Sequence, residues 1–109
     1  MSQTVNIPER LPISIDPNEL AALCRRYGIR ELALFGSVLR NDFTSQSDVD
    51  VLYEMGPTSA IRSLFDLGRL VSDLEVLVGR RVDVANKQRL YPVLREEILS
   101  TRRVIYAET

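Results

Sequence analysis

Histidine and tryptophan are both absent from this chain of 109 residues, which contains one cysteine and one lysine. Without histidine, the chain cannot carry a Ser-His-Asp triad, a Cys-His pair, an HExxH zinc site or a histidine acid–base catalyst. The lone Cys24 excludes an internal disulfide and all zinc sites built from Cys-x-x-Cys pairs. Any chemistry must therefore rest on carboxylates, hydroxyls, arginine, the one lysine or a bound metal.

The chain also has neither an excess of basic residues nor a long apolar run. Its 14 Lys and Arg are balanced by 15 Asp and Glu, for a net charge of −1. Binding to nucleic-acid backbones usually depends on a strong positive field, so nucleic acid is not the expected partner. The opening MSQTVNIPERLPISID is too polar and proline-rich for a secretory signal, and no later run approaches membrane-spanning length. We expect a cytoplasmic protein without a membrane partner.

The length and the hydrophobic content of 45% are sufficient for one core and one domain. Residues 1–15 show no helical period and contain Pro8 and Pro12, which favours an extended lead-in over a regular element. A single domain over residues 16–109 is therefore expected.

Three helices are expected within this domain. Asp16, followed by proline and then glutamate, is a typical helix start, and Gly28 is a typical end. Apolar residues at three- and four-residue steps predict a longer helix over Ser59–Val78, in which Gly68 costs roughly 1 kcal/mol relative to alanine. A final helix can open at Pro92.

Short apolar runs predict four strands between these helices. They are Glu31–Phe35, Asp48–Tyr53, Arg81–Ala85 and, as a last edge strand, Val104–Tyr106. The first is too short for a helix. In the second, successive side chains alternate between faces, so Val49 and Val51 point into the layer opposite the acidic residues. Arg80–Arg81 follows an expected helix end, where cations offset the helix dipole, and is interpreted in that way.

The segment FGSVLRNDFTSQSDVD, residues 35–50, is the most informative stretch of the chain. Gly36 and Ser37 follow an expected strand and precede a short helical turn, which would aim backbone N–H groups and a hydroxyl at one point and suit phosphate oxygens. A side chain at position 36 would block close approach of the phosphate. A Gly-Ser pair alone is more often an ordinary strand-ending turn, because two-residue matches are common by chance.

Two aspartates, Asp48 and Asp50, close this segment and lie on one face of their expected strand. Two such carboxylates repel each other unless a cation lies between them, and Mg²⁺ prefers hard oxygen ligands shared with substrate phosphates. Asp83, in another expected strand, can supply a third carboxylate and complete a two-metal arrangement with ions roughly 3.5–4 Å apart. This chemistry serves phosphoryl or nucleotidyl transfer, whereas the competing interpretation is a loop beside an acidic strand edge.

The stretch GSVLRNDFTSQSDVDVLY, with Gly-Ser, ten intervening residues and Asp-x-Asp, resembles the signature of the nucleotidyltransferase superfamily that includes DNA polymerase beta. The short length, FGSVLR, SDVDVL and the later LEVLVGRRVDVANKQRL are similar to its minimal nucleotidyltransferase branch. The resemblance covers most of residues 20–106. It implies an α/β (α+β) fold with a small mixed β-sheet and helices packed on one side.

The resemblance also implies roles for individual residues. Gly36 and Ser37 would hold the nucleotide triphosphate. The metal ligands for two Mg²⁺ ions would be Asp48, Asp50 and Asp83, with Asp83 also activating the acceptor hydroxyl. Two flanking residues, Arg40 and Ser47, would contact phosphates.

Members of this branch are commonly antitoxins whose partner is an all-helical HEPN ribonuclease. The resemblance therefore implies transfer of AMP from ATP to a toxin hydroxyl, a tyrosine, in a hetero-oligomeric complex. Two alternatives remain: an antitoxin that acts by binding alone, and a nucleotidyltransferase that modifies a small hydroxylated molecule such as an antibiotic.

Overall fold

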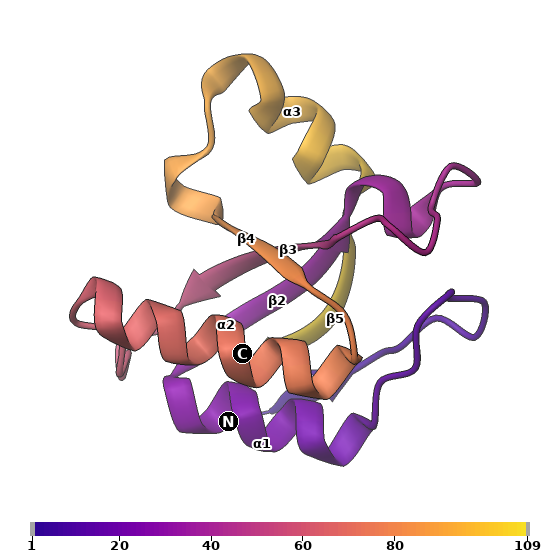
Figure 1. Cartoon of the computed structure of the whole chain (residues 1–109). Coiled ribbons are helices and arrows are strands. Elements are labelled where there is room, and N and C mark those ends of the chain that lie inside the picture. Colours follow the sequence, from indigo (N-terminus) through magenta and orange to yellow (C-terminus); the bar gives the residue numbers. More distant parts are fainter. Residues whose placement is uncertain (1, 109) are drawn as a thin grey trace.

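A computed structural model describes residues 2–108, which form a five-stranded sheet with three α-helices and two short 3₁₀ turns (Figure 1). In chain order the elements are β1 (Gln3–Val5), α1 (Pro17–Tyr27), β2 (Ile29–Phe35), η1 (Gly36–Leu39), β3 (Val49–Met55), α2 (Leu64–Val78), β4 (Val82–Asn86), η2 (Lys87–Arg89), α3 (Pro92–Thr101) and β5 (Arg103–Glu108). The strand order is β1-β5-β2-β3-β4, and only the β3–β4 pair is parallel. The predicted mixed sheet is confirmed.

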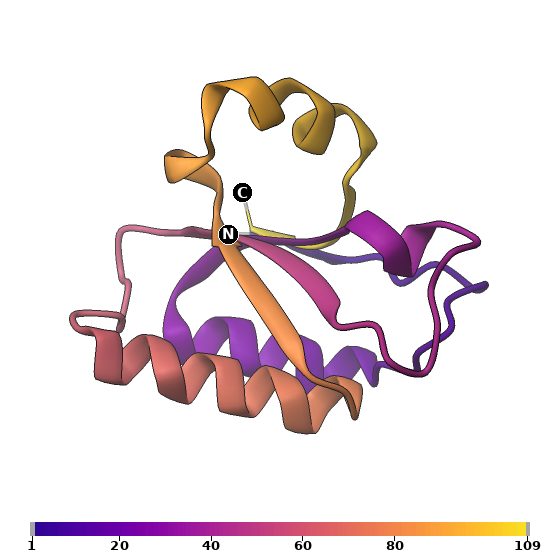
Figure 2. The same ribbon diagram turned by 45° about the horizontal axis from the view of Figure 1, so that its top comes forward.

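The sheet separates two helical layers of different character (Figure 2). Helices α1 and α2 lie side by side on one face, as the expected fold requires, and enclose the main core with that face. Core side chains from these elements are Leu20, Leu23, Leu32, Leu34, Val49, Val51, Leu70 and Leu74. Helix α3 lies over the opposite face, and none of its residues is buried. This face is nevertheless covered in part, because Ala33 and Leu52, which project from it, are fully buried.

Helix α1 begins and ends where the capping signals predict. The Oδ1 atom of Asp16 accepts hydrogen bonds from the backbone N–H groups of Asn18 (2.8 Å) and Glu19 (3.1 Å). Gly28 ends the helix with φ of 71°, a left-handed conformation that suits glycine. Cys24 is fully buried in this helix, and burial raises the pKa of its thiol to about 12. Its interpretation as a small core residue is confirmed.

Helix α2 begins later than the predicted Ser59. Its N-cap is Ser63, whose Oγ accepts from the backbone N–H of Asp66 (3.2 Å), while the Asp66 carboxylate accepts from the N–H of Arg62 (2.9 Å). The Ser63 bond is a typical N-cap contact, and it sets the start of the helix later than apolar spacing predicts. The helix continues through Gly68 to Val78, so the predicted end is confirmed.

Two predictions about the sheet edges are wrong. Residues Gln3–Val5 of the lead-in form β1, which pairs antiparallel with β5. The segment Val104–Tyr106 consequently lies in an inner strand between β1 and β2, and Ile105 and Tyr106 are buried. A sequence of three alternating residues at Gln3–Val5 carries too little local preference to form a strand alone, and β1 exists because β5 provides its partner.

Candidate active site

Residue pairing in the sheet brings Asp50 and Asp83 together. Asp50 of β3 is the register partner of Asp83 in the parallel strand β4, and of Phe35 in β2. Paired residues of neighbouring strands project from the same face, and such strands are about 4.8 Å apart. Since Val49 and Val51 face the core beneath α1 and α2, both aspartates lie on the opposite face, on the side of α3. Asp50 and Asp83 thus lie next to each other in the sheet, as predicted.

Asp48 is placed differently from the other two aspartates. It lies one residue before β3, its side chain is 44% exposed, and its Oδ1 atom is 3.4 Å from Nε of Arg81. Within residues 2–108, no group of three or more His, Cys, Asp or Glu residues is close enough together to hold a metal ion. Of the three predicted metal ligands, Asp50 and Asp83 are therefore paired, whereas Asp48 lies next to them and contacts Arg81.

The electrostatics of Asp50 favour a cation. Burial raises the pKa of Asp50, the neighbouring carboxylates of Asp83 and Asp48 raise it further, and Arg40 partly opposes them. An ionised Asp50 is therefore destabilised where it stands, and a bound positive charge would relieve both the burial penalty and the repulsion. The oxygen-only donors Asp50 and Asp83, with Asp48 at the edge, match the chemistry that Mg²⁺ prefers.

Gly36 is required by Asp50 itself. It has φ of 76°, and a Cβ atom at this position would come within 2.3 Å of Oδ2 of Asp50. A glycine at position 36 therefore allows the strand-ending turn to close over the carboxylate. Ser37 lies half-buried in the same turn, where its carbonyl accepts a hydrogen bond from the N–H of Arg40 (2.9 Å). The structure thus places Gly36 and Ser37 beside the paired aspartates.

The two flanking residues predicted to contact phosphates are already engaged. Arg40 donates from Nε and Nη2 to the two carboxylate oxygens of Asp42, at 3.1 and 3.3 Å, and this partner raises the pKa of Arg40. The Oγ atom of Ser47 accepts from the backbone N–H of Thr44 (2.9 Å) and so closes a turn. These contacts do not use every donor of the two side chains, because the Arg40 guanidinium has five N–H groups and the Ser47 hydroxyl accepts from Thr44 and can still donate.

Arg80, which the sequence interpretation assigned only to the end of a helix, lies near the site. Its guanidinium donates hydrogen bonds to the backbone carbonyls of Thr44 and Ser47. Arg80 therefore does more than offset the dipole at the end of α2. A helix-terminal arginine pair is too common a pattern to predict such a contact, since its partners are backbone atoms more than thirty residues away.

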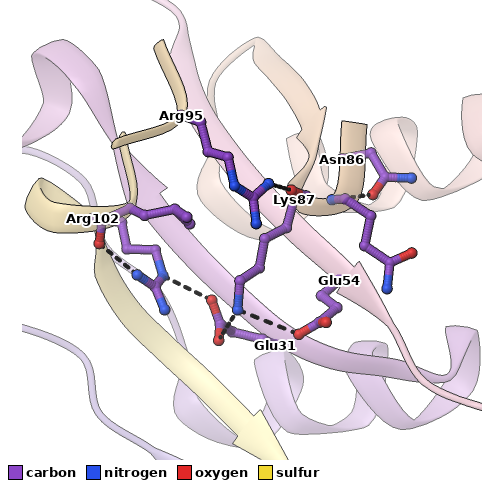
Figure 3. A network of polar contacts seen from close by, with 8 residues as sticks. Glu31, Glu54, Asn86, Lys87, Arg95 and Arg102 are labelled. Atoms are coloured by element: carbon purple, nitrogen blue, oxygen red, sulfur yellow. Dashed lines mark hydrogen bonds and ion pairs between the residues drawn. The ribbon is translucent and has the colours of Figure 1, made fainter. Parts of the chain in front are cut away.

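A network of charged side chains joins β2 and β3 to the segments around α3 (Figure 3). It lies on the sheet face of Asp50, because Glu54 is four residues further along β3 and side chains alternate between faces. Nζ of Lys87 lies 3.0 Å from Glu31 and 3.4 Å from Glu54, and Nε of Arg102 lies 2.9 Å from Glu31. Arg95 donates to the carbonyl of Lys87 (3.1 Å). Arg102 follows α3 and Arg95 lies in its first half, so these contacts hold α3 at both ends although it buries no residue.

Comparison with known proteins identifies the fold family. The nucleotidyltransferase domain family matches residues 20–105. Protein adenylyltransferase MntA of Thermococcus cleftensis is 37% identical over 84 residues, which cover 77% of this chain and 80% of that protein. A protein of Methanocaldococcus jannaschii, provisionally named a protein adenylyltransferase, is 37% identical over 75 residues, covering 69% of this chain and 77% of its own.

Solved structures agree with this assignment. One, provisionally named a minimal nucleotidyltransferase, is 36% identical and superposes with a TM-score of 0.63, covering 79% of this chain and 87% of that chain. A toxin–antitoxin structure with AMP-PNP is 18% identical with a TM-score of 0.64, covering 84% and 73%, and its likeness shows the fold alone. The chain belongs to the nucleotidyltransferase domain family, and the predicted enzyme class, nucleotidyltransferase, is confirmed.

Proposed function

We propose that this protein is a Mg²⁺-dependent antitoxin that transfers AMP from ATP to a tyrosine hydroxyl of a partner HEPN toxin. The observation that carries the proposal is the pairing of Asp50 with Asp83 beside Gly36, on the sheet face opposite α1 and α2. The similarity to a named protein adenylyltransferase supports the kind of transfer. Fold neighbours that are toxin–antitoxin structures, one of them with AMP-PNP, support the partner and the donor.

The proposed metal ligands are Asp50 and Asp83, with Asp48 joining them once it leaves Arg81. Bound Mg²⁺ would neutralise charge on the triphosphate and favour the ionised acceptor. The turn at Gly36 and Ser37 would hold the triphosphate, and Arg40 would turn from Asp42 to a phosphate oxygen. These residues thereby orient the α-phosphorus toward the acceptor.

The transfer balances without any further reactant. The acceptor oxygen forms a bond to the α-phosphorus of ATP, the bond from that phosphorus to the bridging oxygen breaks, and pyrophosphate leaves. A tyrosine hydroxyl has an ordinary pKa of about 10 and must lose its proton. Asp83 is exposed, so its carboxylate is accessible to an acceptor from solution and is our choice for the group that takes this proton.

The proposal includes the cytoplasmic location expected from the sequence. No helix within residues 2–108 is long and apolar enough to cross a membrane. The proposed partner is a protein, in a hetero-oligomeric complex, rather than nucleic acid or lipid.

The direct test is to incubate the protein with Mg²⁺, ATP and the candidate toxin, and to weigh the toxin by intact-mass spectrometry. We expect a gain of one or more AMP units, which Asp50→Asn and Asp83→Asn each abolish. Peptide mapping then identifies the modified residue. A toxin whose mass stays unchanged while its ribonuclease activity is suppressed would refute the transfer.

Two other functions remain distinguishable by the same reagents. If the double variant Asp48→Ala, Asp50→Ala still suppresses the toxin as well as wild type, the protein acts by binding alone. If AMP appears on an added small hydroxylated compound and never on a protein, the enzyme modifies small molecules. Loss of Asp48 and Asp50 is expected to abolish modification of a small molecule, but not suppression of the toxin by binding alone.

A further inference from the structure

Arg80, in the connection between α2 and β4, contacts the loop over residues 43–47, which directly precedes Asp48. Its Nη2 atom donates to the carbonyl oxygens of Thr44 (2.9 Å) and Ser47 (2.7 Å). Its guanidinium carbon is 4.8 Å from the ring centroid of Phe43. Three neighbouring loop positions therefore meet one half-buried cation, and hydrogen bonds from a charged donor are about twice as strong as neutral ones.

The loop is folded so that both carbonyls are available to this one donor. The N–H of Ser47 donates to the carbonyl of Thr44 (3.1 Å), and the N–H of Thr44 donates to Oγ of Ser47 (2.9 Å). The N–H of Gln46 donates to Oγ1 of Thr44 (3.2 Å). The turn is thus closed by its own hydrogen bonds, and Arg80 joins it to a different part of the chain.

The contact between Arg80 and the loop lies directly before Asp48, ahead of β3, and close before Asp83 in β4. Ser47 precedes Asp48, and Arg80 lies three residues before Asp83. Beside this contact, the N–H of Val49 donates to the carbonyl of Arg81 (2.9 Å). Arg80 therefore crosslinks the beginnings of β3 and β4, the two strands whose register pairs Asp50 with Asp83.

We propose that Arg80 is a positioning residue, which sets Asp48 and Asp50 against Asp83 by holding the loop over residues 43–47. The inference rests on the proposed function for its catalytic consequence. Arginine suits the role because its planar group bonds two carbonyls and stacks on a ring together, whereas a lysine ammonium is a compact charge without that geometry. A cation that only offset the dipole at the end of α2 would need the charge alone.

The first test needs no nucleotide, metal or toxin. Hydrogen–deuterium exchange is measured on metal-free wild type, Arg80→Lys, Arg80→Ala and the control Arg62→Ala, an exposed arginine ahead of the other end of α2. We expect the Ser47 and Val49 amides to exchange about tenfold faster in both Arg80 variants, as the loss of charge-assisted hydrogen bonds predicts. Amides of β2 and β5 should keep their wild-type rates, as should every amide measured in Arg62→Ala.

The second test follows transfer kinetics in the same four proteins. Misplaced carboxylates reduce kcat and raise the Mg²⁺ concentration needed for half-maximal rate, whereas loss of a phosphate contact raises the KM for ATP. We expect kcat to fall about tenfold in both Arg80 variants, with the KM for ATP changed less than about twofold. Arg62→Ala should match wild type.

Three results would overturn the inference. Wild-type activity in Arg80→Lys would show that charge alone suffices. A raised KM for ATP with unchanged kcat would assign Arg80 to the nucleotide, and faster exchange throughout the sheet would assign it to overall stability. If wild type itself transfers no AMP, the proposed function fails, and the exchange result alone decides whether Arg80 holds the loop.

Discussion

Gly36 lies so close to Asp50 that a Cβ atom at position 36 would approach Oδ2 of the carboxylate to 2.3 Å. Gly36 opens η1 directly after β2, and Asp50 lies at the beginning of β3. They meet because Phe35 pairs with Asp50 in the sheet. The glycine of the signature is thus tied sterically to the second aspartate of the same signature.

Replacing Gly36 with alanine is expected to reduce both stability and activity. The left-handed backbone alone costs about 1–2 kcal/mol for an alanine, and the new methyl group also displaces the Asp50 carboxylate. We expect AMP transfer to fall about 100-fold or more, since the group facing the reacting charge moves. Urea unfolding and intact-mass kinetics measure the two effects.

Gly79→Ala is the matched control for this prediction. Gly79 has nearly the same φ, 71°, and its Cβ would meet nothing within 4 Å. This variant should lose only the backbone part of that stability, about 1–2 kcal/mol, and keep its transfer rate at 25 °C. Equal activity losses in the two alanine variants would contradict the steric link between Gly36 and Asp50.

Asp50→Asn is expected to stabilise the metal-free protein while abolishing transfer. Burial and the carboxylates of Asp83 and Asp48 raise the pKa of Asp50 above its unfolded value. The neutral form is therefore favoured in the fold, and its stabilising contribution is lost as pH rises through the folded pKa. At pH 7 the neutral asparagine avoids this loss, so the variant should show the higher melting temperature in EDTA.

Magnesium should reverse that order. We expect added Mg²⁺ to raise the melting temperature of wild type, because a cation offsets the repulsion, and to change that of Asp50→Asn little. A wild type that is insensitive to Mg²⁺ and to EDTA, with ATP present or absent, would argue against the metal site.

Glu31→Gln is expected to destabilise the protein at pH 7 by about 1–3 kcal/mol, because two cations in a half-buried network lose their charged partner. Burial acts to raise the pKa of Glu31, but hydrogen bonds from Arg102 and Lys87 outweigh it and lower the pKa below its ordinary value. A lowered folded pKa gives stability that is present above the unfolded pKa and lost as pH falls through the folded one.

The difference between wild type and Glu31→Gln should therefore shrink as the unfolding experiment is moved from pH 7 to below about pH 4. Glu96→Gln, at an exposed glutamate of α3, is the control and should stay within about 0.5 kcal/mol of wild type. A difference for Glu31→Gln that is independent of pH would rule out its charge as the cause.

Tyr27→Phe is expected to cost about 1–2 kcal/mol of stability and no activity. The Tyr27 hydroxyl donates to Oδ2 of Asp73 at 2.5 Å and joins α1 to α2, on the face opposite the paired aspartates. Arg26→Ala removes only an exposed ion pair to the same carboxylate, at 3.4 Å, and should change stability by less than about 0.5 kcal/mol. Thermal unfolding and transfer assays of the two variants check this, and a transfer defect in Tyr27→Phe would contradict it.

Local signals predicted those elements whose causes are local. The Asp16 cap, Gly28 and the alternation from Val49 to Tyr53 act over a few residues, and the structure has the corresponding helix and strand. The start of α2 was predicted too early because apolar spacing extends back to Ile61, whereas the N-cap of the helix is Ser63.

In the candidate site, too, some features were predicted from local spacing and others were not. The spacing of Gly36, Asp48 and Asp50 pointed to phosphate and metal chemistry, and the structure places Gly36 against Asp50. The engagement of Arg40 by Asp42 could not be read from spacing, because it depends on which nearby partner the side chain selects. The contact of Arg80 with the Thr44 carbonyl crosses 36 positions and has no sequence signal at all.

The amino-acid sequence by itself determined the helix caps, the strand periodicity and the identity of the acidic and glycine residues, because these depend on neighbours along the chain. Only the tertiary structure decided that β5 lies inside the sheet, that Asp50 faces Asp83 and that Asp48 turns toward Arg81. Strand order and register arise from the joint burial of side chains distant in sequence, a free energy that no single segment carries.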